Sequence, residues 1–150
     1  LESIVNETVK TLPLETGGVL LGYWAESHSE VVITHAVGPG PLAIHSEDSF
    51  HPDTDYHTSE IARIYEASGR LYTYLGDWHS HPDGRPYLSH RDKTTIRKIS
   101  KYTPARALVP LMAVVGTNPE WMMVVWSYFP RGFKSRWRAR CLPLRVEITT

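Results

Sequence analysis

The sequence predicts an α+β fold in which helices flank a mixed or antiparallel β-sheet. Segments with apolar residues at helical spacing are interspersed with apolar, β-branched runs of strand length. Their order is helix, two strands, helix, strand, helix and then about three strands, which is typical of this class. A chain of 150 residues is long enough to bury a core, and we expect residues 1–150 to form a single domain.

The first third of the chain predicts a helix followed by a β-hairpin. Apolar residues from Ile4 to Leu12 recur at roughly helical spacing, and Pro13 ends this helix. The runs VLLGYW (19–24) and VVITHAV (31–37) have strand composition. Because a short polar stretch joins them, we expect the two strands to pair as a hairpin.

The middle of the chain predicts a long loop, a helix and a strand. Residues 38–57 are rich in Pro, Gly and acids and have the composition of a loop. Residues 58–69 place apolar side chains on one helical face and stop at Gly69. Residues 71–81 have strand composition.

The last third predicts a helix and further strands. The run from Ser89 to Lys101 is amphipathic and is closed by a Thr-Pro pair. Two apolar runs, 107–115 and 120–129, are joined by a turn signal, and the alternation in 131–149 predicts another strand. Its arginines should face solvent: Arg136, Arg138 and Arg140.

Charge is distributed unevenly along a chain whose net charge is zero. Residues 1–90 contain 4 Lys and Arg against 13 Asp and Glu, whereas residues 91–150 contain 12 against 3. In one domain the two halves interleave in space, so the asymmetry favours a polarised surface over nucleic-acid binding. We therefore expect no nucleic-acid partner.

The location expected for this protein is the cytoplasm, without a membrane partner. The opening residues lack a basic segment followed by an apolar core, and the most apolar later run is interrupted by Pro110. The lone cysteine, Cys141, fits a reducing compartment and reads as a small buried hydrophobe. Because the chain opens on Leu1 and not on Met, we expect its natural N-terminus to be trimmed or absent.

The stretch GDWHSHPDGRPYLSHRD (76–92) concentrates groups that bind metals. His79 and His81 lie two apart on a predicted strand, so both imidazoles project from the same face. Asp92 lies in the first turn of the next predicted helix, where the helix dipole favours a carboxylate. Two histidines and one carboxylate are a ligand set for zinc that leaves the fourth position open, as catalytic sites do.

Two alternatives remain open on the residues alone. Ser89-x-x-Asp92 also has the form of a capping box, so helix capping by itself would explain both residues. Hydrolysis further needs a general base, and no HExxH motif supplies one. Glu15 is attractive because it precedes a strand and two glycines. The competing carboxylates lie in the long loop: Glu47, Asp48 and Asp53.

These residues resemble the JAB/MPN domain family in its metal-binding form, called JAMM. The family signature is a Glu, then His-x-His-Pro, six residues, Ser, two residues and Asp. The matching elements here are Glu15 in ETGGVLLG, His79-Ser80-His81-Pro82, DGRPYL and Ser89-His90-Arg91-Asp92. The phrases GPGP, HPDTDY and YLGDWHSHP are most similar to the bacterial, Prok-JAB branch.

The resemblance implies a JAB/MPN-like fold with cytidine deaminase-like layering and one Zn²⁺ per chain, bound by His79, His81 and Asp92. It implies that Glu15 is the general base, which takes a proton from the attacking water and delivers it to the leaving amine, and that Ser89 stabilises the oxyanion. The reaction would be hydrolysis of the bond after the C-terminal glycine of a ubiquitin-like protein. That protein or its conjugate is the implied substrate, and ubiquitin-activating-like and conjugating-like enzymes are implied partners.

Two other functions compete with this one. A hydrolase that trims a sulfur-carrier protein or cleaves a small amide would use the same chemistry. A metal-free MPN scaffold would use the fold only for binding, but such scaffolds typically lack the ligands that this chain keeps. Of the other residues, we expect Trp78 in the core, His90 not to be a ligand, and solvent-facing histidines in the loop: His45, His51 and His57.

Overall fold

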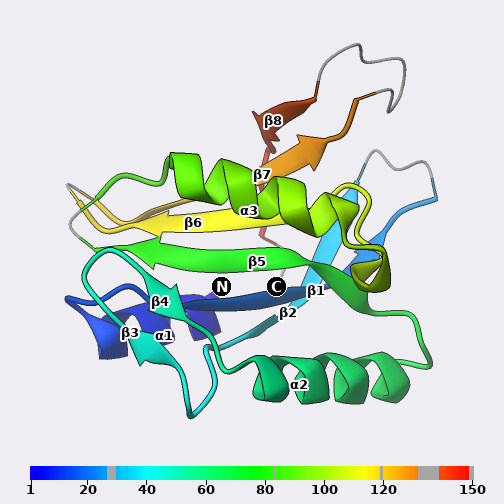
Figure 1. The fold of residues 1–150 in the computed structure, drawn as a ribbon, viewed down its shortest axis with the longest axis horizontal. Helices are drawn as coiled ribbons and strands as arrows, with labels where there is room; N and C mark the ends of the chain where they lie inside the picture. Colours follow the sequence, from blue (N-terminus) through cyan, green and yellow to red (C-terminus); the bar gives the residue numbers. More distant parts are fainter. Residues whose placement is uncertain (27–29, 83, 119, 132–138, 149–150) are drawn as a thin grey trace.

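A computed structural model describes residues 1–26, 30–82, 84–118, 120–131 and 139–148 (Figure 1). Its helices are α1 (Glu2–Thr11), α2 (Thr54–Ala67) and α3 (His90–Lys101), with a short 3-10 helix η1 (Thr103–Ala105). Its strands are β1 (Gly17–Trp24), β2 (Val31–Val37), β3 (Ile44–His45), β4 (Phe50–His51), β5 (Thr73–His81), β6 (Leu111–Gly116), β7 (Met122–Phe129) and β8 (Arg140–Pro143). The α+β class predicted from the sequence is confirmed.

The main sheet is mixed and has the strand order β2-β1-β5-β6-β7-β8. Strands β5 and β6 pair in parallel, and the other neighbours pair antiparallel, including the predicted β1–β2 hairpin. Helix α3 provides the crossover between the two parallel strands. Figure 1 shows α3 and α2 along one face of the sheet, with α1 behind it.

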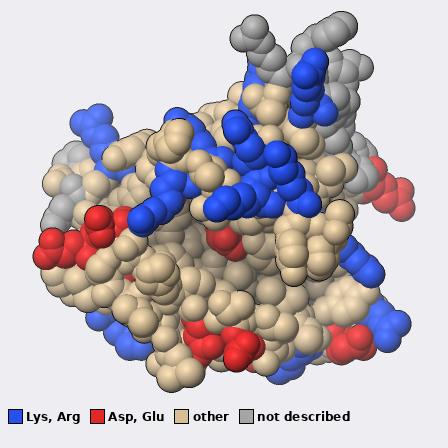
Figure 2. Space-filling view, viewed as in Figure 1, with Lys and Arg blue, Asp and Glu red and all other residues tan. Residues whose placement is uncertain are grey.

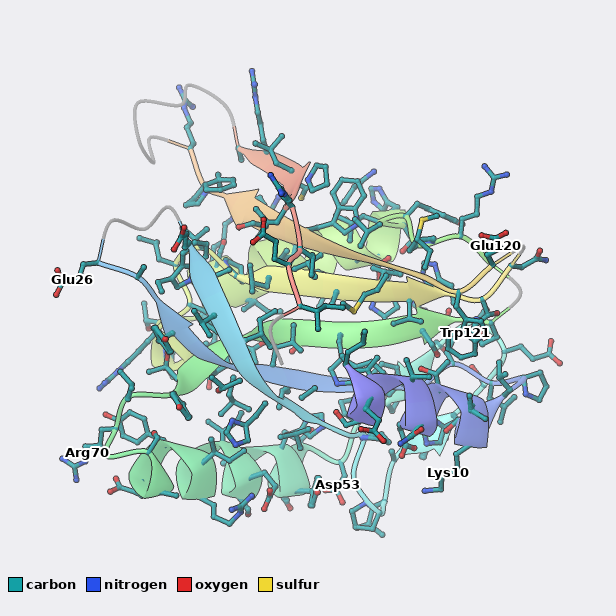
Figure 3. All side chains as sticks on the ribbon, turned by 180° about the vertical axis from the view of Figure 1, so that it is seen from behind. Lys10, Glu26, Asp53, Arg70, Glu120 and Trp121 are labelled. Atoms are coloured by element: carbon teal, nitrogen blue, oxygen red, sulfur yellow. The ribbon has the colours of Figure 1, made fainter. Side chains whose placement is uncertain are left out.

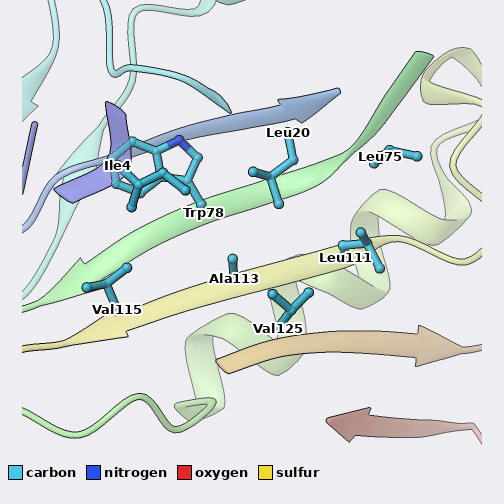
Figure 4. Close-up of a cluster of buried hydrophobic side chains, with 8 residues drawn as sticks. All are labelled: Ile4, Leu20, Leu75, Trp78, Leu111, Ala113, Val115 and Val125. Carbon is cyan, nitrogen blue, oxygen red and sulfur yellow. The ribbon is translucent and has the colours of Figure 1, made fainter. Parts of the chain in front are cut away.

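The face of the sheet that carries α1 holds the largest cluster of buried side chains (Figure 4). Its members are Ile4, Leu20, Leu75, Trp78, Leu111, Ala113, Val115 and Val125. Trp78 is 1% exposed, and its indole Nε1 donates a 2.9 Å hydrogen bond to the carbonyl of Val37. The expected core position of Trp78 is therefore confirmed.

The opposite face is packed in two places with a polar strip between them. Ile96 of α3 packs on Met112 and Val114, whereas Ile64 of α2 packs on Val19 and Leu21. Successive side chains of a strand point to opposite faces of the sheet. Because Trp78 lies on the α1 face, the residues before and after it on β5 point to the other face. Asp77, His79 and His81 therefore project into the strip between α2 and α3.

The predicted loop 38–57 differs from the observed structure. Strands β3 and β4 form a small antiparallel hairpin within it, and α2 begins at Thr54, four residues before the expected position. The reason is an N-cap: Asp53 Oδ1 accepts a 3.1 Å hydrogen bond from the backbone N–H of Tyr56. Figure 3 shows Asp53 at the start of α2.

The remaining expectations divide between confirmed and untested. Helix α3 follows Ser89 as expected, while β6 begins at Leu111, later than the predicted 107. Of the expected arginine stripe, Arg140 is exposed on β8, and Arg136 and Arg138 lie outside the described residues. That residues 1–150 form a single domain stays a prediction.

The surface is polarised, as the charge pattern predicted. Figure 2 shows Lys and Arg side chains gathered over α3, whose exposed side includes Arg91, Lys93, Arg97, Lys98 and Lys101. Cys141 lies half-buried on β8 against the α3 cluster, and burial raises the pKa of its thiol. Within the described part of the chain, no helix has the length and apolar character needed to cross a bilayer.

Candidate metal centre

Strand β5 places two imidazoles side by side at its C-terminal end. It pairs with β1 on one side and β6 on the other, so its backbone is fixed along the segment 77–81. His79 and His81 project from the same face, and their Nε2 atoms are 3.0 Å apart. At this distance the two ring nitrogens can bind the same metal ion.

The start of α3 brings a carboxylate to the same point. Ser89 Oγ accepts a 3.2 Å hydrogen bond from the Asp92 N–H, and Asp92 Oδ2 accepts a 2.7 Å bond from the Ser89 N–H. This is a capping box, so that interpretation of the motif is correct. It does not displace the ligand interpretation, because Asp92 Oδ1 lies 3.4 Å from His79 Nε2.

The three side chains together fit a metal ion. Within the described ranges they form the only group of three or more His, Cys, Asp or Glu residues with ligand atoms mutually within 4.8 Å. Ligand atoms of a tetrahedral zinc site lie about 3.3 Å apart. The distances here are 3.0 Å between the two Nε2 atoms, 3.4 Å from His79 to Asp92 Oδ1 and 3.9 Å from His81 to Asp92 Oδ2.

The protonation states also suit a ligand group. His81 Nδ1 donates a 3.1 Å hydrogen bond to the carbonyl of Arg85, which leaves Nε2 as the acceptor. Burial and the neighbouring His79 lower the pKa of His81 and favour the neutral ring. For Asp92, burial opposes ionisation, but the hydrogen bond and charge of His79 and the bonds from Ser89 outweigh it. The pKa of Asp92 therefore stays well below its usual range.

Glu15 lies beside this group, immediately before β1. Burial raises the pKa of its carboxyl group, and the charges of Asp92 and Asp48 raise it further, while those of His79 and Arg91 oppose the rise. These interactions link the Glu15 carboxyl group electrostatically to two of the three candidate ligands. A carboxylate with a raised pKa is better matched to general base catalysis near neutral pH than an ordinary glutamate.

The carboxylates that compete with Glu15 are engaged elsewhere or exposed. Asp53 caps α2 and also accepts a 3.2 Å hydrogen bond from the N–H of Leu42. Glu47 and Asp48 are exposed at the tip of the β3–β4 hairpin. Glu15 therefore stays the candidate base, because its carboxyl group interacts electrostatically with His79 and Asp92.

All three loop histidines were expected to face solvent, but two of them do not. His57 is buried, and its Nε2 donates a 2.9 Å hydrogen bond to the carbonyl of Gly38. His45 is half-buried, and its Nδ1 lies 2.8 Å from the carbonyl oxygen of Glu15. His51 is exposed as expected, and His90 is exposed and outside the ligand group. Nothing in the local sequence signals the contact of His45, because its partner is thirty residues away.

Comparisons with known proteins agree with this site. The sequence model of the family described as "Prokaryotic homologs of the JAB domain" matches residues 1–128. A protein named probable metalloprotease y4qB from Sinorhizobium fredii is 39% identical over 129 residues, which cover 83% of this chain and 77% of that protein. Proteins named CD-NTase/cGAS isopeptidase are 28% identical in Enterobacter hormaechei and 31% identical in Vibrio cholerae.

The isopeptidase matches cover 79% and 56% of this chain, and this chain spans only 64% and 53% of those relatives. Among solved structures, protein DSY2949 from Desulfitobacterium hafniense superposes with a TM-score of 0.63 over 86% of this chain and 80% of its own, at 17% identity. That likeness supports the fold alone. The relatives support a peptidase or isopeptidase activity, and the family match over residues 1–128 shows that this chain is an enzyme of the prokaryotic JAB-domain family.

Proposed function

We propose that this chain is a zinc-dependent isopeptidase or peptidase that hydrolyses the bond after the C-terminal glycine of a ubiquitin-like protein. The observation that carries the proposal is the convergence of His79, His81 and Asp92 beside Glu15. The donor set, two imidazole nitrogens and one carboxylate oxygen, is one that zinc uses in catalytic sites. A bound zinc ion would polarise the scissile carbonyl and make water a stronger acid.

In this proposal Glu15 moves the proton. Its carboxylate accepts a proton from the water whose oxygen forms a bond to the carbonyl carbon, and then delivers that proton to the leaving nitrogen as the C–N bond breaks. The products are a free carboxylate and an amine. The raised pKa of Glu15 supports this role, since the same group must first accept and then donate the proton.

Ser89 has a hydroxyl donor available for the oxyanion. In the capping box its Oγ accepts a hydrogen bond from the Asp92 N–H through a lone pair, so the O–H can turn from the Asp92 carboxylate toward the developing oxyanion. A donor fixed at the N-terminus of α3 is preorganised to stabilise negative charge that develops on the carbonyl oxygen. Capping and catalysis are thus compatible roles for one side chain.

The substrate proposal draws on the relatives. Since three of them are named CD-NTase/cGAS isopeptidase, a CD-NTase/cGAS protein conjugated through an isopeptide bond is the first conjugate to test. Ubiquitin-activating-like and conjugating-like enzymes, which would make such a conjugate, are the proposed partners. We further propose that the protein works in the cytoplasm.

The test combines metal analysis with cleavage. Purified protein is expected to contain about one zinc per chain by elemental mass spectrometry. Ubiquitin-like proteins fused through their terminal glycine to a fluorescent protein, and the CD-NTase conjugate, would be incubated with it, and the new termini identified by mass spectrometry. Glu15→Gln is the matched control, expected to keep the metal and to lose activity by about 10²- to 10⁴-fold.

Three results would contradict the proposal. If the protein takes up no zinc even on reconstitution, the proposed cofactor is wrong. If cleavage occurs at positions unrelated to a terminal glycine, the proposed substrate class is wrong. Full activity in Glu15→Gln would remove the assigned base while leaving the metal site in place.

A further inference from the structure

We propose that His45 is a positioning residue. Its Nδ1 donates a hydrogen bond to the Glu15 carbonyl, and this bond attaches the proposed base to the β3–β4 hairpin and keeps it beside the metal ligands. The catalytic part of this inference rests on the proposed function. The hydrogen bond itself can be tested without any activity.

The hairpin takes up both backbone polar groups of Glu15. The ring of His45 reaches the Glu15 carbonyl at 2.8 Å, and the Glu15 N–H donates a 2.8 Å bond to the carbonyl of Ser46. Glu15 precedes β1, whose pairing with β5 begins at Gly17. The sheet ladder therefore does not reach Glu15, and the hairpin supplies the hydrogen bonds that a neighbouring strand would otherwise make.

A second contact ties the next residue to the strand that carries the ligands. The Thr16 N–H donates to Ser80 Oγ at 3.0 Å, and the Ser80 N–H donates to the Thr16 carbonyl at 2.8 Å. Thr16 and Ser80 are both 0% exposed. The backbone on the C-terminal side of Glu15 is therefore fixed to the residue between the two histidines, and His45 fixes the position of Glu15 itself.

The hairpin is in turn anchored to the elements around the site. The ring of Phe50 packs against Gly17 so closely that a Cβ there would collide with it. The His45 ring stacks on Phe50 with centroids 6.4 Å apart and planes 15° apart. On the far side of the site, Arg91 of α3 donates a 3.4 Å hydrogen bond to the carbonyl of Asp48. His45 thus bonds Glu15 from a support that is attached to β1 and α3.

The chemistry of the ring gives a direct test in the unmodified protein. A carbonyl only accepts hydrogen bonds, so His45 must carry a proton on Nδ1. Two-dimensional ¹⁵N–¹H correlation of the imidazole rings is expected to give a protonated Nδ1 for His45. The Glu15 amide is expected to exchange slowly with solvent. A His45 ring protonated on Nε2 alone would overturn the inference, whatever the activity of the enzyme.

Three variants separate positioning from mere packing. His45→Leu retains the bulk but removes the donor, and kcat is expected to fall about 10- to 100-fold because small misplacements of catalytic groups are costly. The KM and the zinc content should stay near the parent values. His45→Asn, whose amide can present an N–H close to the Nδ1 position, should recover activity to within about threefold of the parent. His51→Leu, on the exposed side of the neighbouring strand β4, is the matched control and should match the parent.

The outcomes also separate this inference from the proposed function. A parent enzyme that cleaves the fusions, with kcat unchanged in His45→Leu, would overturn the inference and leave the function standing. A parent protein that cleaves none of the substrates would refute the proposed function. The hydrogen bond from His45 to Glu15 would still be supported if His45 is protonated on Nδ1 and if exchange of the Glu15 amide with solvent becomes faster in His45→Leu but not in His51→Leu.

Discussion

The ligand group and the proposed base reach the same site by different routes. His79, His81 and Asp92 lie within residues 79–92, and strand alternation and a capping box orient them. Glu15 comes from a connection at the far end of the sequence and is held by a hairpin that contributes no ligand. We call His79, His81 and Asp92 the ligand half of the site, and Glu15 with the β3–β4 hairpin the base half. The ligand half is positioned by contacts within a short segment of the chain. The base half is positioned only when the segment of Glu15, the hairpin and the ligand segment pack together.

This difference suggests that the two halves can be broken separately. Loss of a ligand should act on metal binding, and loss of the helix cap should act on the stability of α3. Loss of the contacts around Glu15 should act on turnover and leave the metal in place. Of the four predictions below, given in order of decreasing effect, the first three test that separation.

The largest effect is expected for Asp92→Ala. Both the metal ligand and the acceptor for the Ser89 N–H are lost, so zinc content should fall to background and cleavage should become undetectable. Asp92→Asn is the matched control: its side-chain oxygen can still accept from Ser89, so the metal-free variant should unfold near the temperature of the metal-free parent, although it binds the metal more weakly. Elemental mass spectrometry and circular dichroism measure the two quantities. Zinc retained in Asp92→Ala would contradict the ligand assignment.

Ser89→Ala should lower both turnover and stability while the metal remains. Loss of an oxyanion donor costs about 10²- to 10³-fold in kcat. Loss of an N-cap costs about 1 kcal/mol in the free energy of unfolding. Steady-state kinetics and urea unfolding measure the two effects, and Ser89→Thr should recover most of both. A loss of stability without a loss of kcat would leave Ser89 as a helix cap alone.

Gly17→Ala should damage the base half. A Cβ at this position would meet the Phe50 ring and the backbone carbonyl of Trp78, and such overpacking costs about 1–3 kcal/mol. Because Phe50 supports the hairpin, kcat should fall about tenfold or more while zinc content is kept. In Gly38→Ala the nearest atoms lie 3.9 Å or more from the new methyl group, so this control should behave as the parent does. Zinc lost together with activity would refute the separation of the halves.

The smallest effect concerns Asp77, which neighbours the site and accepts a 2.6 Å hydrogen bond from the Tyr74 hydroxyl. Burial raises the pKa of Asp77 from its ordinary value of 3.8, although the Tyr74 hydrogen bond and the charges of His57 and His79 oppose the rise. The folded state therefore binds this proton more tightly than the unfolded state. The resulting stability is lost as pH rises through the folded pKa.

Asp77→Asn removes the free-energy cost of burying an ionised carboxylate and keeps an acceptor for the Tyr74 hydroxyl. The metal-free variant should melt at a higher temperature than the metal-free parent near pH 8, and the difference should shrink as pH falls toward 4. Thermal unfolding by circular dichroism across this range is the measurement. A variant that is less stable than the parent at pH 8 would mean that the Asp77 charge is compensated in the folded protein.

The elements that the sequence predicted well are those with local causes. Ser89 and the Thr-Pro pair bracket α3 because caps and prolines act within a few residues. The β1–β2 hairpin and β5 follow from strand composition alone. In contrast, the strands β3 and β4 have two residues each, which is too short for any periodicity to mark them. The early start of α2 was missed because its cap, Asp53, lies among other acids.

By itself the sequence determined the class of the fold, the family resemblance and the residues that bring nitrogen and oxygen ligands together. Their spacing is short enough for strand alternation and helix capping to fix the geometry. Only the tertiary structure decided that the Glu15 carboxyl group interacts electrostatically with His79 and Asp92 and that His45 bonds to the Glu15 backbone. Both depend on contacts between residues far apart in the chain, which form because the sheet and its hairpin pack together and which leave no pattern in the local sequence.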